Sequence, residues 1–300
     1  MGDICRVLRT DVEAERFVEG ILDIENTKEK RTAINSITAA ERNISDYERY
    51  STFTQCDNRD FKWRDNKKRK QLRQQIIDEL YKMERLDNDE LIKLGKGGSK
   101  PKTDVDKYKA FYVIGSPASG KSGISVKLAD KFNAYLLDSD FAKRKLPEYK
   151  NQIAPASLVH EESGELVYNT NSDSLMTRCL NNNYSMVIPK IGDDVDKVIK
   201  LCAGLRNAGY SVYLISVDLD RKKTTLRAYY RYKETGRYVP LSLIFDKYGN
   251  QPSLSYFRIK QQHKDIFSGF AQISTDVPKG SPAILLEEEN LPELKDIDWR

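Results

Sequence analysis

The chain has 300 residues, 39% of them hydrophobic and 32% charged, which is enough apolar material for a core and excludes a wholly disordered chain. No stretch approaches the roughly 18 uninterrupted apolar residues of a membrane-spanning helix, and residues 1–6 lack the apolar region of a signal peptide. We therefore expect a cytoplasmic protein with no membrane partner. The net charge of +5 suits an anionic ligand such as a nucleotide and is too small to demand a nucleic acid partner.

Cysteine and histidine are scarce in this chain. The four cysteines lie far apart, and only two histidines accompany them. Zinc sites need closely spaced ligands, and disulfide frameworks are typical of much shorter secreted chains. We expect neither, and we expect reduced, mostly buried thiols.

The chain divides by pattern into a helical N-terminal region and a later region of mixed character. In the first part, apolar residues recur every three or four positions, as on one face of a helix. These residues are Ala14, Phe17, Val18 and Ile21, then Ile37, Ala40, Ile44 and Tyr47, and then Leu72, Ile76, Leu80 and Met83. We expect a helical region over 1–93 and a linker or loop over 94–109, where glycine, serine and proline are concentrated.

From residue 110 onward, short apolar runs alternate with helical patterns. The runs span 110–114, 134–137, 184–188 and 211–217, with a fifth at either 271–274 or 283–286. Strands that alternate with helices form a parallel sheet covered on both faces. We therefore predict an α/β domain over 110–300, with a parallel sheet and helices on both sides.

A glycine-rich segment between the first predicted strand and the first predicted helix matches the pattern G-x-x-x-x-G-K-[ST]. Its residues are Gly115, Ser116, Pro117, Ala118, Ser119, Gly120, Lys121 and Ser122. Glycines let the backbone direct its N–H groups at phosphate oxygens, and the helix that follows adds its positive end. Lys121 would reach the β- and γ-phosphates, and Ser122 would bind Mg²⁺. The pattern predicts a P-loop fold of the nucleoside-kinase type, with ATP or GTP and Mg²⁺ as ligands.

Two carboxylates follow the second predicted strand. Asp138 and Asp140 end that strand, at the edge of a parallel sheet where ligands bind. A carboxylate there can accept the proton of a hydroxyl group that attacks the γ-phosphoryl. We favour Asp140 for this role, while Asp138 could equally be a helix cap.

Arginines follow the fourth predicted strand. Arg227 and Arg231 lie four apart on one predicted helix face, and Arg237 follows Gly236 in a turn. Arginines in such a helix and turn can close over the phosphates and neutralise charge in the transition state. A solvated basic helix is the alternative interpretation of this segment.

Taken together, these motifs resemble the zeta toxins of bacterial epsilon/zeta toxin–antitoxin systems. The resemblance covers roughly residues 90–275 and includes the glycine-rich loop, the D-x-D strand end, the segment 156–163 and the pattern R-x-x-x-x-x-R-x-x-P. It implies a P-loop kinase that transfers the γ-phosphoryl group to the 3′-hydroxyl of the amino sugar of UDP-N-acetylglucosamine. It also implies an antitoxin partner, which could be a separate chain. The N-terminal helices could take that role in cis, or they could be a helical extension that completes the kinase core.

The resemblance also implies roles for individual residues. Lys121 and Ser122 would serve the triphosphate and Mg²⁺, Asp140 would be the base, and Arg231 and Arg237 would be the lid arginines. On the substrate side it points to Asp173, predicted on the helix before the third strand, and to His160 and Glu161. The alternative for His160 is a surface residue at a helix start.

One departure from the family pattern concerns the end of the third predicted strand. Several zeta toxins carry an acidic residue there, whereas this chain has Lys190 in the run 187–192. An acid that would bind the sugar is therefore missing or supplied elsewhere. Lys190 could instead meet a phosphate, or it could be a surface lysine at the strand end.

Three alternatives to a sugar-nucleotide kinase stay open. The acceptor could be another nucleotide, NAD included, or a nucleic-acid 5′-end. A GTPase-type switch is disfavoured because the chain lacks an N-K-x-D motif. A basic binding module could use the run 67–70, although a solvated helix start explains that run as well.

Overall fold

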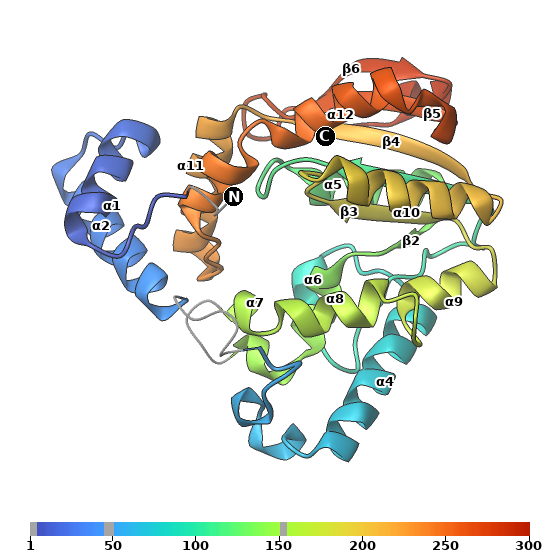
Figure 1. The fold of residues 1–300 in the computed structure, drawn as a ribbon, viewed down its shortest axis with the longest axis horizontal. Helices are drawn as coiled ribbons and strands as arrows, with labels where there is room; N and C mark the ends of the chain where they lie inside the picture. The colour runs from blue at the N-terminus through green and yellow to red at the C-terminus, as the bar shows by residue number, and fades with distance from the viewer. Residues whose placement is uncertain (1–4, 45–50, 151–154) are drawn as a thin grey trace.

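A six-stranded sheet forms the centre of the computed structural model, which describes residues 5–44, 51–150 and 155–300 (Figure 1). The strands lie in the order β2-β3-β1-β4-β5-β6. They are β1 (Lys109–Ile114), β2 (Tyr135–Leu136), β3 (Met186–Lys190), β4 (Ser211–Asp218), β5 (Gly269–Ser274) and β6 (Ile284–Glu289). Neighbouring strands from β2 to β5 are parallel, whereas β6 is antiparallel to β5. The predicted α/β fold is confirmed.

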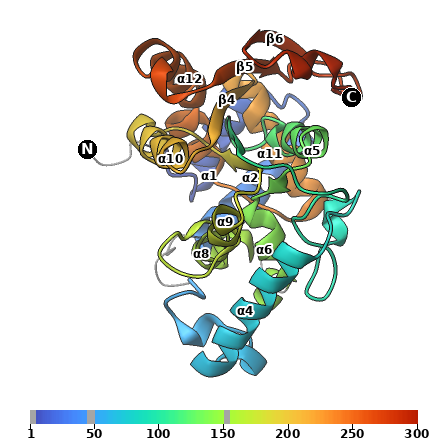
Figure 2. The ribbon, with the colours of Figure 1, turned by 90° about the vertical axis from the view of Figure 1, so that its right-hand side faces the viewer.

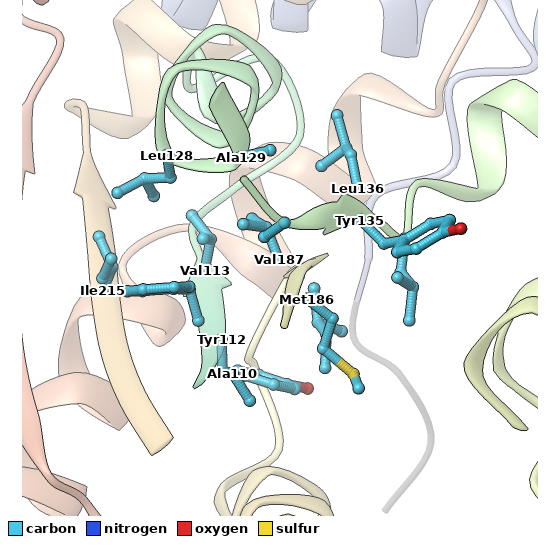
Figure 3. Close-up of a cluster of buried hydrophobic side chains, with 14 of the residues drawn as sticks. Ala110, Tyr112, Val113, Leu128, Ala129, Tyr135, Leu136, Met186, Val187 and Ile215 are labelled. Carbon is cyan, nitrogen blue, oxygen red and sulfur yellow. The ribbon is translucent and has the colours of Figure 1, made fainter. Parts of the chain in front are cut away.

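The parallel strands are almost continuously apolar because both faces of the sheet are covered. Ala110 through Ile114 of β1 are all buried, and β1 pairs with β3 on one side and β4 on the other. Their side chains join those of α5 (Lys121–Lys131) in one core (Figure 3). In Figure 2, α5 lies on one face, and α10 (Val195–Asn207) and α12 (Gln251–Gln262) lie on the other.

The remaining elements of the α/β part extend from the β2 edge and from the ends of the strands. The helices are α6 (Ser139–Lys145), α7 (Pro155–Leu158), α8 (His160–Tyr168), α9 (Leu175–Asn181), α11 (Arg221–Thr235) and η6 (Leu243–Tyr248). Short helical turns along the whole chain are η2 (Cys56–Asn58), η3 (Phe61–Trp63), η4 (Asp89–Leu91), η5 (Pro147–Lys150), η7 (Lys264–Ile266) and η8 (Pro292–Asp296).

No helix within the described ranges is long and apolar enough to cross a membrane. Cys179 and Cys202 are buried free thiols, whereas Cys56 is exposed.

The N-terminal helices occupy two separate places in the fold. Helices α1 (Asp11–Phe17), η1 (Val18–Leu22) and α2 (Thr27–Asn43) pack on α11 and η6, where they form a second apolar cluster. Helix α4 (Asn66–Lys82) instead packs against α6, α8 and α9 on the opposite side of the molecule (Figures 1 and 2). The predicted stripes lie in these helices, except that Ile44 and Met83 follow the last residues of α2 and α4, and Tyr47 lies outside the described residues.

Helix α4 is fixed to the α/β part by buried ion pairs. The Arg69 guanidinium lies 2.7 Å from Glu148 Oε1 of η5 and donates at 2.7 Å to Glu162 Oε1 of α8. Lys145 Nζ of α6 lies 2.7 Å from Glu79 Oε2 of α4. All five of these side chains are more than nine-tenths buried. Burying charges is costly unless they are paired, so these pairs hold α4 in one position.

The glycine-rich segment that precedes β1 is packed rather than free. The Ser99 N–H donates to the Leu80 carbonyl at 2.8 Å, and the Ser99 carbonyl accepts from the Leu136 N–H at 3.1 Å. A Cβ atom on Gly98 would lie 2.2 Å from the Met83 carbonyl oxygen, so only glycine fits there. Residues 94–108 form a loop, and backbone hydrogen bonds tie its part around Ser99 between α4 and β2.

Candidate active site

The glycine-rich loop joins β1 to α5 in a conformation that depends on its glycines. A Cβ atom on Gly115 would lie 2.6 Å from the Val217 carbonyl oxygen, so no other residue fits without a shift of the backbone. Gly120 has a φ of +90°, in the left-handed region that favours glycine, and it is the N-cap of α5. The N–H groups in the first turn of this helix can donate hydrogen bonds to an anion.

Lys121 folds back over the loop in this structure. Its Nζ atom donates to the carbonyls of Gly115 at 2.5 Å and Ser116 at 2.7 Å. The pKa of Lys121 is lowered to about 7, mainly by burial and further by Arg231, while Asp138 opposes that shift. A triphosphate would replace the two carbonyls as the partner of this ammonium group.

The two aspartates after β2 have different surroundings. Asp138 is the N-cap of α6 and accepts the Asp140 N–H at 2.9 Å. Burial raises the pKa of Asp138, and the nearby carboxylate of Asp140 raises it further. Burial also raises the pKa of Asp140, but the charges of Lys143 and Arg237 outweigh it and lower that pKa. Lys143 Nζ lies 2.9 Å from Asp140 Oδ1, and Arg237 forms an ion pair with Asp140 Oδ2.

Of the predicted lid arginines, Arg237 in the turn after α11 pairs with this carboxylate, and Arg231 of α11 is its electrostatic neighbour. Helix α11 begins after Asp220, which caps it, and ends at Gly236, whose φ is +71°. Burial and, to a smaller extent, the neighbouring Arg237 lower the pKa of Arg231 to about 10. The Nε atoms of Arg231 and Arg237 are buried and lack a hydrogen-bond partner in the described part of the chain. Such unsatisfied donors fit the oxygens of a phosphate group.

Arg227 belongs to the same predicted lid segment as Arg231 and Arg237, but it contacts other residues. Its Nη2 atom donates at 2.9 Å to the Thr275 carbonyl, and the Thr275 hydroxyl donates at 2.7 Å to the Ser119 carbonyl. Arg227 is therefore linked to the glycine-rich loop through Thr275. Asp218, at the end of β4, accepts from Ser253 and Gln272.

Basic side chains lie on the α8 side of the two aspartates. Lys190, at the end of β3, places its Nζ atom 2.9 Å from the ring centroid of Tyr168. The pKa of Lys190 is lowered to about 7 by burial, with a smaller contribution from Lys143. His160 begins α8 and keeps part of its surface in solvent, but the surrounding protein and Lys143 lower the pKa of its imidazole.

Two of the predicted substrate residues are engaged elsewhere. Asp173 precedes α9 rather than lying on a helix, and its carboxylate accepts from Arg178 at 2.7 Å and from Gln74 at 2.9 Å. Glu161 accepts the Ser51 hydroxyl at 2.5 Å. The structure therefore gathers the glycine-rich loop, Asp140 and the lid arginines, with His160 and Lys190 beside them, and it gives Asp173 and Glu161 other partners.

Lys143 is the principal residue at this site that the sequence analysis missed. It lies three residues after Asp140, and residues three apart on a helix are neighbours. The segment after the D-x-D strand end contains Lys143, Arg144 and Lys145, so the sequence alone does not single one of them out. In the structure, Lys143 forms an ion pair with Asp140, Arg144 with Glu90 and Lys145 with Glu79.

A parallel sheet with a glycine-rich loop between its central strand and the helix that follows defines a P-loop fold of the kinase type. The family model for the zeta toxins matches residues 96–266, which is more than half of the chain. The chain therefore belongs to the zeta toxin family, as its motifs predicted. No curated protein sequence matches the chain.

The solved structures that resemble this chain have low sequence identity to it. A chain described with the PezAT chromosomal toxin–antitoxin system of Streptococcus pneumoniae is 18% identical, with 62% of this chain and 74% of that chain covered and a TM-score of 0.48. The native AvrRxo1-ORF1:-ORF2 complex contains a chain that is 16% identical, with 84% and 76% covered and a TM-score of 0.45. The AvrRxo1-ORF1:-ORF2 structure with ATP gives 16% identity, 64% and 63% coverage and a TM-score of 0.42.

Proposed function

We propose that this chain transfers the γ-phosphoryl group of ATP to a hydroxyl of a sugar nucleotide, with the 3′-hydroxyl of the amino sugar of UDP-N-acetylglucosamine as the first acceptor to test. The observation that carries the proposal is the ion pair between Arg237 and Asp140, because it joins a lid cation to a carboxylate at the loop. Membership of the zeta toxin family supports kinase chemistry.

The part of the site that would bind ATP, which we call the donor side, would hold the triphosphate through N–H groups and positively charged side chains. The N–H groups of the glycine-rich loop, the Lys121 ammonium and the unpartnered Nε atoms of Arg231 and Arg237 would bind phosphate oxygens. Mg²⁺ prefers oxygen ligands, and the exposed Ser122 hydroxyl together with phosphate oxygens offers them. The bound ion would neutralise charge on the β- and γ-phosphates.

The transfer step needs a proton acceptor at the attacking hydroxyl. The acceptor oxygen would form a bond to the γ-phosphorus as the bond to the β-phosphate oxygen breaks, and Asp140 would take the hydroxyl proton. Arg237 holds Asp140 before the substrates bind, so we propose that the incoming triphosphate draws the guanidinium away. The pKa of Asp140 would then rise toward that of a useful base.

The lowered pKa of Lys121 predicts that ATP binding takes up a proton. In the free protein Lys121 has a pKa of about 7, so at pH 8 it is mostly neutral, and the bound triphosphate would protonate it. The affinity should therefore fall by up to about tenfold for each pH unit above pH 7. Calorimetry at pH 8 in two buffers of different ionisation enthalpy measures the uptake. Binding without proton exchange at pH 8 would show that Lys121 is already charged.

The reaction itself is tested by product analysis. The protein is incubated with Mg-ATP and, separately, with UDP-N-acetylglucosamine, NAD, other nucleotides and oligonucleotides, and mass spectrometry detects an added phosphoryl group. GTP in place of ATP tests the donor. Transfer to the sugar nucleotide supports the proposal, and transfer to another acceptor corrects the substrate. Hydrolysis alone or no reaction would refute a kinase function.

An antitoxin is the partner that family membership suggests, and we propose the segment 8–44 as its candidate in cis. This part of the N-terminal region packs on α11 and the segment after it. The Tyr232 hydroxyl of α11 donates to the Ser36 carbonyl, and the Tyr238 hydroxyl, beyond the helix, donates to the buried Glu41 carboxylate at 2.6 Å. It lies on the side of α11 away from the sheet (Figure 1). A chain that begins at Ser51 should be more active if the segment restrains the lid, and less active or insoluble if it completes the fold.

A further inference from the structure

The lid segment, residues 227–240, contains the same dipeptide twice, an arginine followed by a tyrosine. Arg231 and Tyr232 lie on α11, and Arg237 and Tyr238 lie in the turn after it. Both arginines are neighbours of Asp140 of α6, whereas both tyrosines contact α2. Figure 1 shows α2 and α6 on different sides of α11. Each dipeptide therefore has its arginine at the candidate site and its tyrosine on the N-terminal region.

The tyrosine after Arg237 is held by a buried hydrogen bond. Tyr238 is fully buried, and its hydroxyl donates at 2.6 Å to the carboxylate of Glu41, which is also buried. Glu41 lies in the last turn of α2. A buried carboxylate without a donor is costly, so the two groups fix each other. Because neighbouring Cα atoms are about 3.8 Å apart, this contact limits where the backbone of Arg237 can lie.

The tyrosine after Arg231 makes a longer contact with the same helix. The Tyr232 hydroxyl donates at 3.3 Å to the Ser36 carbonyl of α2. Its ring meets the ring of Tyr238 edge to face, with the centroids 4.9 Å apart, which is a favourable geometry for two aromatic rings. The two tyrosines therefore form one unit, which packs on α2 together with the second apolar cluster.

The two arginine side chains have few contacts of their own. Within the described ranges, Arg237 forms an ion pair only with Asp140, and Arg231 forms none. The Nε atoms of both also lack a hydrogen-bond partner there. A long side chain keeps a precise position only if its backbone is fixed, and a displacement of about 1 Å can cost about 100-fold in rate. The arginines therefore depend on what holds the chain beside them.

We propose that Tyr238 and Glu41 are positioning residues for Arg237, and that Tyr232 supports Arg231 in the same way through its longer contact. This inference rests on the proposed function, which places both arginines at the transferred phosphoryl group. With the backbone fixed from α2, only the guanidinium of Arg237 moves when a triphosphate draws it from Asp140. Of the two outcomes given above for a chain that begins at residue 51, the inference predicts the lower activity.

The positioning role is tested by the turnover number for phosphoryl transfer in Tyr238→Phe, with Tyr230→Phe as the matched control. Tyr230 is an exposed tyrosine of α11. Tyr238→Phe keeps the ring and removes only the hydroxyl. We expect its turnover number to fall about ten- to hundredfold with little change in the KM for ATP, because the lid arginines act on charge in the transition state. Tyr230→Phe should match the wild type. An unchanged or higher turnover number in Tyr238→Phe overturns the positioning role.

Variants of Glu41 test the acceptor of the same hydrogen bond. Glu41→Gln keeps an oxygen that accepts from the Tyr238 hydroxyl, so it should retain most of the turnover that Glu41→Leu loses. Equal loss in both would show that the hydrogen bond is not what matters at this position. Tyr232→Phe should cost less turnover than Tyr238→Phe, since its hydrogen bond is longer.

A second background separates positioning from a general loss of structure. Tyr238→Phe is introduced into the Arg237→Ala variant, and the turnover number of the double variant is compared with that of Arg237→Ala. If the hydroxyl acts through Arg237, the added substitution should change the turnover number by less than about twofold. A further fall as large as the one in the wild type would overturn the positioning role.

Hydrogen exchange of residues 236–241 in the full chain separates this inference from the proposed function. This segment should exchange about five- to tenfold faster in Tyr238→Phe than in the wild type or Tyr230→Phe, as for the loss of one local hydrogen bond. Equal exchange in all three proteins overturns the positioning role, even where transfer occurs. Faster exchange in Tyr238→Phe, in a protein that transfers phosphoryl to no acceptor, would refute the kinase and leave the hold of α2 on this turn standing.

Discussion

Replacing Asp140 by Asn is expected to lower the turnover number for phosphoryl transfer about 10²–10⁴-fold, which is the range for loss of a general base. The side chain keeps its shape, but the amide cannot accept the proton of the acceptor hydroxyl. Arg237 and Lys143 also lose the charge that holds them. ATP affinity should change little, because the glycine-rich loop and Lys121 are intact. Turnover and ATP binding are measured separately on the same preparation.

Asp138→Asn is the matched control for this prediction. Asp138 caps α6, and Asn caps helices nearly as well as Asp, so the fold should be preserved. Burial and the Asp140 carboxylate raise the pKa of Asp138, which makes it the rival candidate for the base. A severe loss in Asp138→Asn together with a mild one in Asp140→Asn would reverse the two roles.

Arg69→Met is expected to lower the free energy of unfolding by about 3–5 kcal/mol, as found when one partner of a buried ion pair is removed. The substitution leaves Glu148 and Glu162 buried without the guanidinium that pairs with both. Arg73 still reaches Glu162, but Glu148 loses its pairing cation. Urea denaturation measures the change in stability, with the slope checked for constancy.

Lys70→Met provides the control for the loss at Arg69. Lys70 is the next residue on α4 and is exposed, so its replacement should alter stability by less than about 0.5 kcal/mol. If Arg69→Met were equally mild, the buried ion pairs would not be what fixes α4 to the rest of the fold. The prediction also separates Arg69 from its basic neighbours, which the sequence alone groups as one solvated run.

Local patterns were sufficient to predict the elements that form the candidate site. The apolar run before Gly115 is β1 and the loop is followed by α5, whereas the two aspartates lie just beyond β2, at the N-cap and in the first turn of α6. Each of these depends on neighbouring residues in the chain, because a buried parallel strand must be apolar and the turn after it needs glycine. The two alternative positions for a fifth strand are both strands, β5 and β6. β6 is antiparallel to β5 because residues 275–283 are too few for a crossover.

Contacts between distant residues could not be predicted in the same way. The helical stripes of residues 1–93 reveal that α2 and α4 bury one face, but they do not reveal that α2 packs on α11 while α4 packs on α8. The partners of Glu161 and Asp173 are likewise set by segments far away in the chain, Ser51 and Gln74. A single sequence carries no signal for such pairs, since each residue alone fits an exposed position as well.

The most direct test of a phosphotransferase site at the glycine-rich loop is the transfer of labelled phosphoryl from γ-labelled Mg-ATP by the wild type, Lys121→Ala and Lys127→Ala. Both lysines belong to α5, but Lys127 is remote from the loop and donates to the Asp298 carbonyl. Lys121→Ala should abolish transfer because the β- and γ-phosphates lose their cation, and Lys127→Ala should retain it. Full transfer by Lys121→Ala would contradict the assignment of this loop as the donor site.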